Sequence, residues 1–195
     1  MEKVLTTPIA EADVREFHVG DVFYVTGRMF TARDGAHKMM MEKGAPLSVE
    51  GLPVFHCGPV VRKVGEGWDV LAGGPTTSVR MEGIEPDFLR RFRPRVIVGK
   101  GGMGEKTLAA LSEVGAVYTH FTGGAGALAA QAVKEVEGVY WLEELGIPEA
   151  VWVLRVDNFG PLVVTMDSHG RSLHAELATK VGENMKRAKA AILSE

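Results

Sequence analysis

The chain of 195 residues contains a single cysteine, Cys57. One cysteine cannot form an internal disulfide, and it cannot bind an iron–sulfur cluster unaided. No stretch reaches the roughly 18 consecutive apolar residues of a transmembrane helix, and no basic and then apolar signal pattern opens the chain. The sequence therefore predicts a protein of the cytoplasm with no membrane partner.

Strong charge of one sign is also missing. The net charge is −3 and no basic run occurs, which argues against nucleic acid as a partner. No Ser/His/Asp order, metal-ligand cluster or pair of carboxylates stands out, so the sequence predicts no metal site in this chain. An apolar share of 46% and a charged share of 24% are those of an ordinary globular domain.

Glycine, in contrast, is abundant. The chain has 24 glycines, and several are clustered, at 73–74, 99–104 and 123–124. Glycine clusters between apolar strands suggest loops in which the backbone approaches a ligand closely.

The hydrophobic pattern predicts an α/β fold: a single domain over residues 1–195, with a β-rich first part, no linker and no repeat. The expected strands are Asp21–Thr26, Val54–Cys57, Trp68–Ala72, Arg95–Gly99, Ala116–Thr119, Val151–Val156 and Leu162–Met166, with a turn over Asp157–Pro161 between the last two. The expected helices cover 33–44, 81–91, 104–114, 125–133 and 173–193. Leu177, Val181, Met185, Ala188 and Ile192 form a stripe on the last helix, which predicts that this face is buried.

The stretch VGKGGMGEKT at 98–107 has the appearance of a phosphate-binding loop. A P-loop requires Gly-x4-Gly-Lys-Ser/Thr, but Glu105 stands where the lysine belongs and Lys106 follows one residue late. One residue turns a helix by about 100°, so Lys106 would point away from the loop. A nucleotide P-loop is therefore disfavoured, and Lys100 needs another use.

Cations and hydroxyl groups follow several expected strands. They lie in Thr26–Arg28 with Arg33–His37, in Gly74–Arg80 and in Gly99–Gly102. In α/β sheets, ligands bind beyond the carboxyl ends of the strands. Two arginines and a lysine brought together there suit a small dicarboxylate, because arginine grips a carboxylate with two parallel hydrogen bonds.

Ordinary structural interpretations stay open for each of these residues. Arg33 could pair with a surface acid, and Lys100 could be a solvated charge. Thr76 could cap a helix that starts there, with Arg80 solvated one turn later. His37 and His120 could be interior histidines, and Cys57 a small buried hydrophobic residue.

Taken together, the segments GRMFTARDGAH, HCGPV, GGPTTSVRME, VIVGKGGMG and HFTGGAGALAAQAV resemble the β subunit, or C-terminal domain, of class I fumarate hydratases and its relative, the L-tartrate dehydratase β subunit. The resemblance runs from about Gly20 to His174, at the start of the C-terminal helix at 173–193. It implies a single swivelling β/β/α domain, as in aconitase-type hydro-lyases. It also implies a hetero-oligomer in which the partner α subunit holds an oxygen-sensitive 4Fe–4S cluster through three cysteines.

The same resemblance implies a division of labour among residues. Thr76 matches the proposed base that removes the carbon-bound proton, and Arg80 matches the arginine beside it, while Thr77 is expected in a supporting position. A threonine hydroxyl has a pKa far above neutral, so a nearby cation must stabilise its alkoxide or the proton transfer must be concerted.

Arg33, Arg80 and Lys100 match ligands of the substrate carboxylates, with the backbone at Gly101 close to the substrate and His37 in a supporting position. The predicted reaction is the reversible hydration of fumarate to (S)-malate, with a general acid supplied by the α subunit. The alternatives are dehydration of L-tartrate, which the same motifs serve, and a non-catalytic module that binds dicarboxylates.

Overall fold

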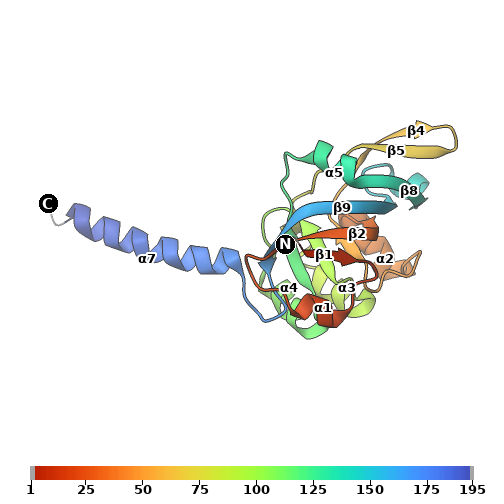
Figure 1. Ribbon diagram of the computed structural model, residues 1–195. Helices are drawn as coiled ribbons and strands as arrows, with labels where there is room; N and C mark the ends of the chain where they lie inside the picture. Colours follow the sequence, from red (N-terminus) through yellow and green to blue (C-terminus); the bar gives the residue numbers. More distant parts are fainter. Residues whose placement is uncertain (1–2, 194–195) are drawn as a thin grey trace.

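Seven of the strands form one mixed sheet, in the order β1-β2-β3-β6-β7-β9-β8 (Figure 1). The structure, a computed structural model, describes residues 3–193, and side chains through residue 189. The strands of this sheet are β1 (Lys3–Thr6), β2 (Val22–Thr31), β3 (Pro53–Phe55), β6 (Val96–Gly99), β7 (Val117–His120), β8 (Val133–Tyr140) and β9 (Val151–Met166). A separate hairpin consists of β4 (Val60–Val64) and β5 (Gly67–Ala72).

A closed ring of strands lies at the centre of the fold. β1, β2, β3, β6 and β7 run parallel in that order. The long strand β9 pairs antiparallel with β7 and also with β2, so β2, β3, β6, β7 and β9 close on themselves. The carboxyl ends of β2, β3 and β6 consequently meet at one edge.

The helices are α1 (Glu11–Arg15), α2 (Asp34–Lys43), the 3-10 turn η1 (Ser78–Met81), α3 (Glu85–Phe92), α4 (Glu105–Val114), α5 (Gly126–Ala132), α6 (Leu142–Leu145) and α7 (Leu173–Leu193). Side chains alternate between two apolar clusters, as the two-residue period of a strand requires: Val96 and Val98 enter one and Ile97 the other. Met40, Phe88 and Leu111 bring α2, α3 and α4 into the second cluster. α2 starts shortly after the end of β2, α3 shortly after η1, and α4 shortly after the end of β6.

The mixed α/β class is confirmed, and most expected elements are present. The helices at 34–43, 105–114, 126–132 and 173–193 lie within a residue or two of their predicted bounds. The expected helix at 81–91 is instead two elements, η1 and α3, and β1, β4 and β8 were not anticipated.

The prediction of a turn over Asp157–Pro161 was wrong. β9 runs without interruption from Val151 to Met166, because β2 pairs along it. The register between β2 and β9 shifts between Phe23 and Gly27, and these shifts accommodate the irregular segment that the sequence presents as a turn.

The prediction of a buried face on the C-terminal helix was also wrong. α7 projects away from the body (Figure 1), and Leu177, Val181 and Met185 are 47%, 62% and 53% exposed. Ala188 is exposed too, and the side chain of Ile192 lies outside the described residues. No helix among the described residues combines the length and the apolar character that crossing a membrane requires.

Candidate active site

The predicted site residues meet where β2, β3 and β6 end. Arg33 follows β2, and Lys100 follows β6 directly. The segment that carries Thr76 lies between them: its backbone N–H donates to the carbonyl of His56, just after β3, at 2.6 Å. Thr77 then pairs with Lys100 in an isolated parallel bridge. Segments far apart in the sequence thus form one edge of the molecule.

Thr76 and Arg80 are in direct contact. Arg80 Nη2 donates a hydrogen bond of 2.7 Å to Thr76 Oγ1, and Asp34 Oδ1 lies 3.7 Å from the same nitrogen. The interpretation of Thr76 as a helix cap was wrong, since η1 starts at Ser78, its N-cap is Thr77, and no side chain caps it. The Thr76 hydroxyl therefore accepts a hydrogen bond from Arg80 and does not cap a helix.

Lys100 is partly exposed and lies beside the Gly123–Gly124 loop. A Cβ atom on Gly123 would lie 2.9 Å from Lys100 Cδ, so a side chain there would displace the lysine from this path. The next residue, Gly101, has a φ of +77° and open space where a Cβ would be, and its carbonyl accepts a bond of 3.0 Å from His174 at the start of α7. The Lys100 loop is anchored but open to a ligand.

Arg33 has an acidic partner, as one interpretation of the sequence proposed. Its Nε lies 2.9 Å from Glu149 Oε1, and both side chains are about one quarter exposed. Glu149 Oε2 also accepts the Gly35 N–H at 2.8 Å, in the first turn of α2. Arg33 Nε has no well-oriented hydrogen-bond partner among the described residues, so Glu149 attracts the guanidinium by charge.

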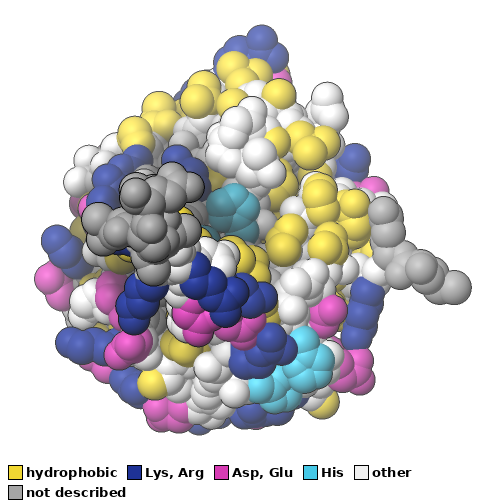
Figure 2. All heavy atoms as spheres, turned by 90° about the vertical axis from the view of Figure 1, so that its left-hand side faces the viewer, with side chains coloured by type: hydrophobic (Ala, Val, Ile, Leu, Met, Phe, Trp, Pro, Cys, Tyr) yellow, Lys and Arg dark blue, Asp and Glu magenta, His cyan; other side chains and the backbone are white. Residues whose placement is uncertain are grey.

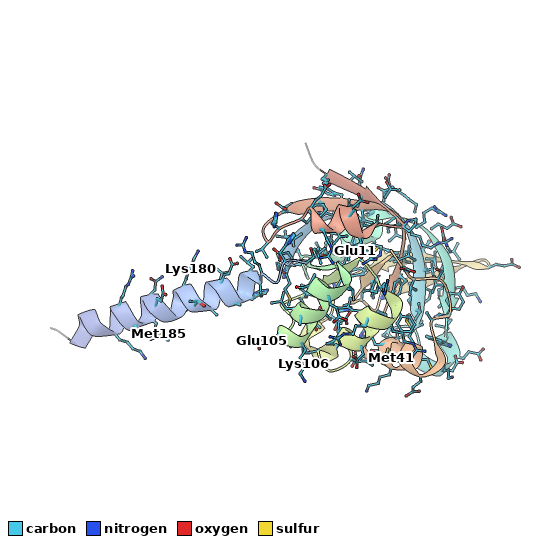
Figure 3. The ribbon with its side chains drawn as sticks, turned by 90° about the horizontal axis from the view of Figure 1, so that it is seen from below. Glu11, Met41, Glu105, Lys106, Lys180 and Met185 are labelled. Carbon is cyan, nitrogen blue, oxygen red and sulfur yellow. The ribbon has the colours of Figure 1, made fainter. Side chains whose placement is uncertain are left out.

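The position that a phosphate would need is filled by the protein itself. At the start of α4, the Glu82 carboxylate accepts the N–H of Gly104 at 2.7 Å, and the N–H and hydroxyl of Thr107 at 3.2 and 2.6 Å. A carboxylate at a helix N-terminus uses the donors and the dipole that would bind an anion. Lys106 is exposed and points away from the body (Figure 3). The P-loop is excluded.

The end of the molecule from which α7 projects carries lysine, arginine and acidic side chains intermixed below the helix, and hydrophobic side chains above it and to its right (Figure 2). His174, in the first turn of α7, ties this end to the Lys100 loop. The visible face thus shows both signs of charge and not one basic stripe.

Comparison with known proteins adds a family to this geometry. Residues 2–177 match the family described as fumarase C-terminus. The chain belongs to this family. The L(+)-tartrate dehydratase subunit beta of Escherichia coli K12 is 45% identical over 178 residues, which cover 90% of this chain and 88% of the relative.

Two further relatives show how the family is built. A putative L(+)-tartrate dehydratase subunit beta of Methanocaldococcus jannaschii is 43% identical over 182 residues, 91% of this chain and 93% of the relative. A putative fumarate hydratase class I of Geobacillus stearothermophilus is 47% identical over 191 residues, which are 97% of this chain and only 37% of that protein. The family domain thus occurs both as a subunit and as part of a longer chain.

The cysteine of this domain does not fit an iron–sulfur site. Cys57 is 1% exposed and is the only cysteine in the sequence, whereas a cluster needs several thiolates. Burial raises the pKa of its thiol to about 12, although the charge of Arg33 works in the opposite direction. The interpretation of Cys57 as a small buried hydrophobic residue is confirmed.

Beneath the loops lies a set of buried polar residues, of which the sequence singled out only His37. His56 and Glu85 are fully buried together with His37, and Ser78 is buried beside them. The interior interpretation of His37 is confirmed, and it keeps this side chain from touching a ligand in front of the loops. Glu85 could not be found from periodicity, because it occupies the first position of a helix, where acids are common on solvated surfaces too.

Proposed function

We propose that this chain is the β subunit of a hydro-lyase that interconverts fumarate and (S)-malate. The family and the relatives, all named for hydro-lyases, support the reaction class. The observation that carries the residue assignment is the bond of 2.7 Å from Arg80 to Thr76, at an edge that also carries Arg33 and Lys100. A hydroxyl bonded to one cation, at an edge that carries two more, fits a dianionic substrate that must lose a proton from carbon.

Thr76 is the base in this proposal. Arginine can only donate hydrogen bonds, so Thr76 Oγ1 is the acceptor and its own proton is free to move elsewhere. The Thr76 hydroxyl gives its own proton to solvent, and the Arg80 guanidinium stabilises the alkoxide that remains. The alkoxide oxygen then takes the proton from the substrate carbon. The hydroxyl of malate leaves with a proton that the partner subunit supplies. When no substrate is bound, Asp34, whose Oδ1 lies 3.7 Å from Arg80 Nη2, partly neutralises the Arg80 guanidinium.

Lys100 and Arg33 hold the two carboxylates. Lys100 offers a point charge on a flexible stem, and Arg33 a planar fork paired in charge with Glu149. Gly101 lets the backbone approach the substrate: it has no side chain, its φ of +77° favours glycine, and the space beside its Cα is open. Thr77, exposed beside Lys100, supports this loop through their backbone bridge.

The relative named class I fumarate hydratase implies an iron–sulfur cluster. This chain offers no fitting set of ligands, so we place the 4Fe–4S cluster on a partner α subunit, with which this chain forms a hetero-oligomer. The partly exposed Arg80 and Asp34, at 46% and 42%, support a site that is completed by another surface. In this proposal the chain is a swivelling domain that closes over the dicarboxylate.

L-tartrate is the second candidate substrate. The relatives named as tartrate dehydratase subunits match this chain along almost their whole length, as separate subunits. A third possibility, a dicarboxylate-binding module without catalysis, shares the cations but not the need for Thr76.

One assay separates the three. The chain is mixed anaerobically with a cluster-bearing α subunit, and dehydration of (S)-malate and of L-tartrate is followed by absorbance. Malate turnover by the mixture but not by the chain alone is the expected result. Turnover of L-tartrate but not of (S)-malate would show that L-tartrate is the substrate. Binding of both compounds without turnover would refute the enzymatic proposal. Iron–sulfur clusters absorb broadly at about 400 nm. Such an absorption in the purified chain would contradict a cluster on the partner.

A further inference from the structure

Glu85 lies between two histidines in the interior of the protein. Its Oε2 is 3.2 Å from His37 Nε2 and 3.3 Å from His56 Nε2, and all three side chains are fully buried. Neither carboxylate oxygen nor either Nε2 atom has a well-oriented hydrogen-bond partner among the described residues. The attraction inside this cluster is therefore mainly one of charge.

The groups that face the ring nitrogens indicate which nitrogens of His37 and His56 carry protons. His37 Nδ1 is 2.9 Å from the carbonyl oxygen of Arg33, which can only accept, so Nδ1 carries a proton. With Nε2 against a carboxylate as well, His37 is an imidazolium. His56 Nδ1 is 3.0 Å from Ser78 Oγ, a hydroxyl that can donate or accept. Because His56 Nε2 faces the Glu85 carboxylate, a neutral His56 carries its proton on Nε2, and Nδ1 then accepts the serine proton. One positive and one negative charge are then buried together.

The energetics agree with these protons. Burial lowers the pKa of His37, but Glu85, the Arg33 carbonyl and Asp34 together outweigh burial and raise it. Burial lowers the pKa of His56, and Glu85 offsets only part of this. Burial raises the pKa of Glu85, yet the two imidazoles bring it down to about 2.

Each end of the cluster reaches a different loop of the candidate site. His37 holds the carbonyl of Arg33. Ser78 Oγ accepts the backbone N–H of Lys100 at 3.2 Å, and the Ser78 N–H donates back to the Lys100 carbonyl at 3.3 Å. Ser78 also lies in the segment between Thr76 and Arg80. The Arg33, Thr76–Arg80 and Lys100 loops are thus also joined through buried groups, beneath their contacts at the surface.

We propose that Glu85, acting through His37, His56 and Ser78, is a positioning residue that holds these three loops in one arrangement. Its effect on turnover rests on the proposed function, but the buried ion pair does not. Two histidines and a carboxylate are also ligands that zinc accepts, so a bound metal is the competing explanation of the cluster.

Nuclear magnetic resonance of the imidazole nitrogens tests the ion pair without any activity. In the full chain labelled with 15N-histidine, His37 should carry protons on both nitrogens at pH 7.5, where a free imidazole with a pKa of about 6.5 is mostly neutral. His56 should carry one proton, on Nε2. Signals are assigned by their loss in His37→Gln and His56→Gln. A neutral His37 in the wild-type chain, or one equivalent of zinc by elemental analysis, overturns the proposal.

Variants test the positioning. Glu85→Gln should make His37 neutral at pH 7.5, and with the α subunit it should lower kcat/KM by up to about 100-fold, as displacement of loops by about 1 Å does. Glu113→Gln, a carboxylate paired with Arg90 on the outer face, is the matched control and should change neither. Ser78→Ala keeps the ion pair and removes the hydroxyl that joins His56 to the Lys100 N–H, so it should raise KM while His37 stays charged.

The pH profile distinguishes positioning from simple stability. Because the pKa of His37 is raised, its charge is present at low pH and lost as the pH rises through the folded value. Wild-type kcat/KM should fall over that range, and the fall should be absent in Glu85→Gln at a temperature where both are folded. A fall of equal size in both refutes positioning by this pair. If the mixture never turns over, the nitrogen spectra still decide on the ion pair.

Discussion

Replacing Thr76 with valine separates a catalytic from a structural hydroxyl. Valine keeps the shape and removes the oxygen that accepts the Arg80 bond of 2.7 Å. Arg80 is 46% exposed, so its guanidinium can turn to water, and the lost bond should cost less than about 1 kcal/mol of unfolding free energy. Loss of a general base should lower kcat by at least about 10²-fold, which adds about 2.7 kcal/mol to the barrier.

The assay is malate dehydration by the reconstituted enzyme beside a chemical denaturation curve for each variant. KM should change little, because Lys100 and Arg33 are intact. Thr77→Val is the control: its hydroxyl is one residue away and exposed, and its rate should stay near that of the wild type. Arg80→Lys should lose rate as severely as Thr76→Val, since lysine cannot reproduce the guanidinium contact. A Thr76→Val enzyme with normal kcat refutes the assignment of the base.

Three further predictions concern other parts of the chain. Lys100→Ala should weaken a competitive dicarboxylate inhibitor by about 1–3 kcal/mol in an inhibition titration, whereas Lys106→Ala should not; the opposite ranking would contradict the site. Native Cys57 should resist alkylation at pH 8, because its thiol pKa is about 12, and react in denaturant; rapid labelling of folded protein would disprove its burial. Gly99→Ala should lose about 1–3 kcal/mol of unfolding free energy, because its Cβ would overlap Ser78 Oγ, while Gly83→Ala, with nothing within 4 Å, should not; equal denaturation midpoints would refute this.

Local pattern was enough for the elements with a clear period and a clear end. Gly115 has a φ of +68° and ends α4 where the sequence places the end, because glycine adopts this conformation without strain. The buried strand β6 reads as an unbroken apolar run because it lies between two parallel neighbours. Pattern failed for β9, since its pairing with β2, more than a hundred residues away, overrides the turn signals of Asn158, Gly160 and Pro161.

For the candidate site, the sequence by itself determined the chemical groups: one cysteine, cations next to hydroxyls, and a glycine loop with the wrong register for phosphate. These follow from residue identity and spacing along one segment. Only the tertiary structure decided that Glu82 fills the start of α4, that α7 stays exposed, and that Glu85 joins His37 to His56. The physical reason is that burial and charge pairing depend on atoms brought together from distant segments, and a carboxylate has the same local signature whether it faces water or two imidazoles.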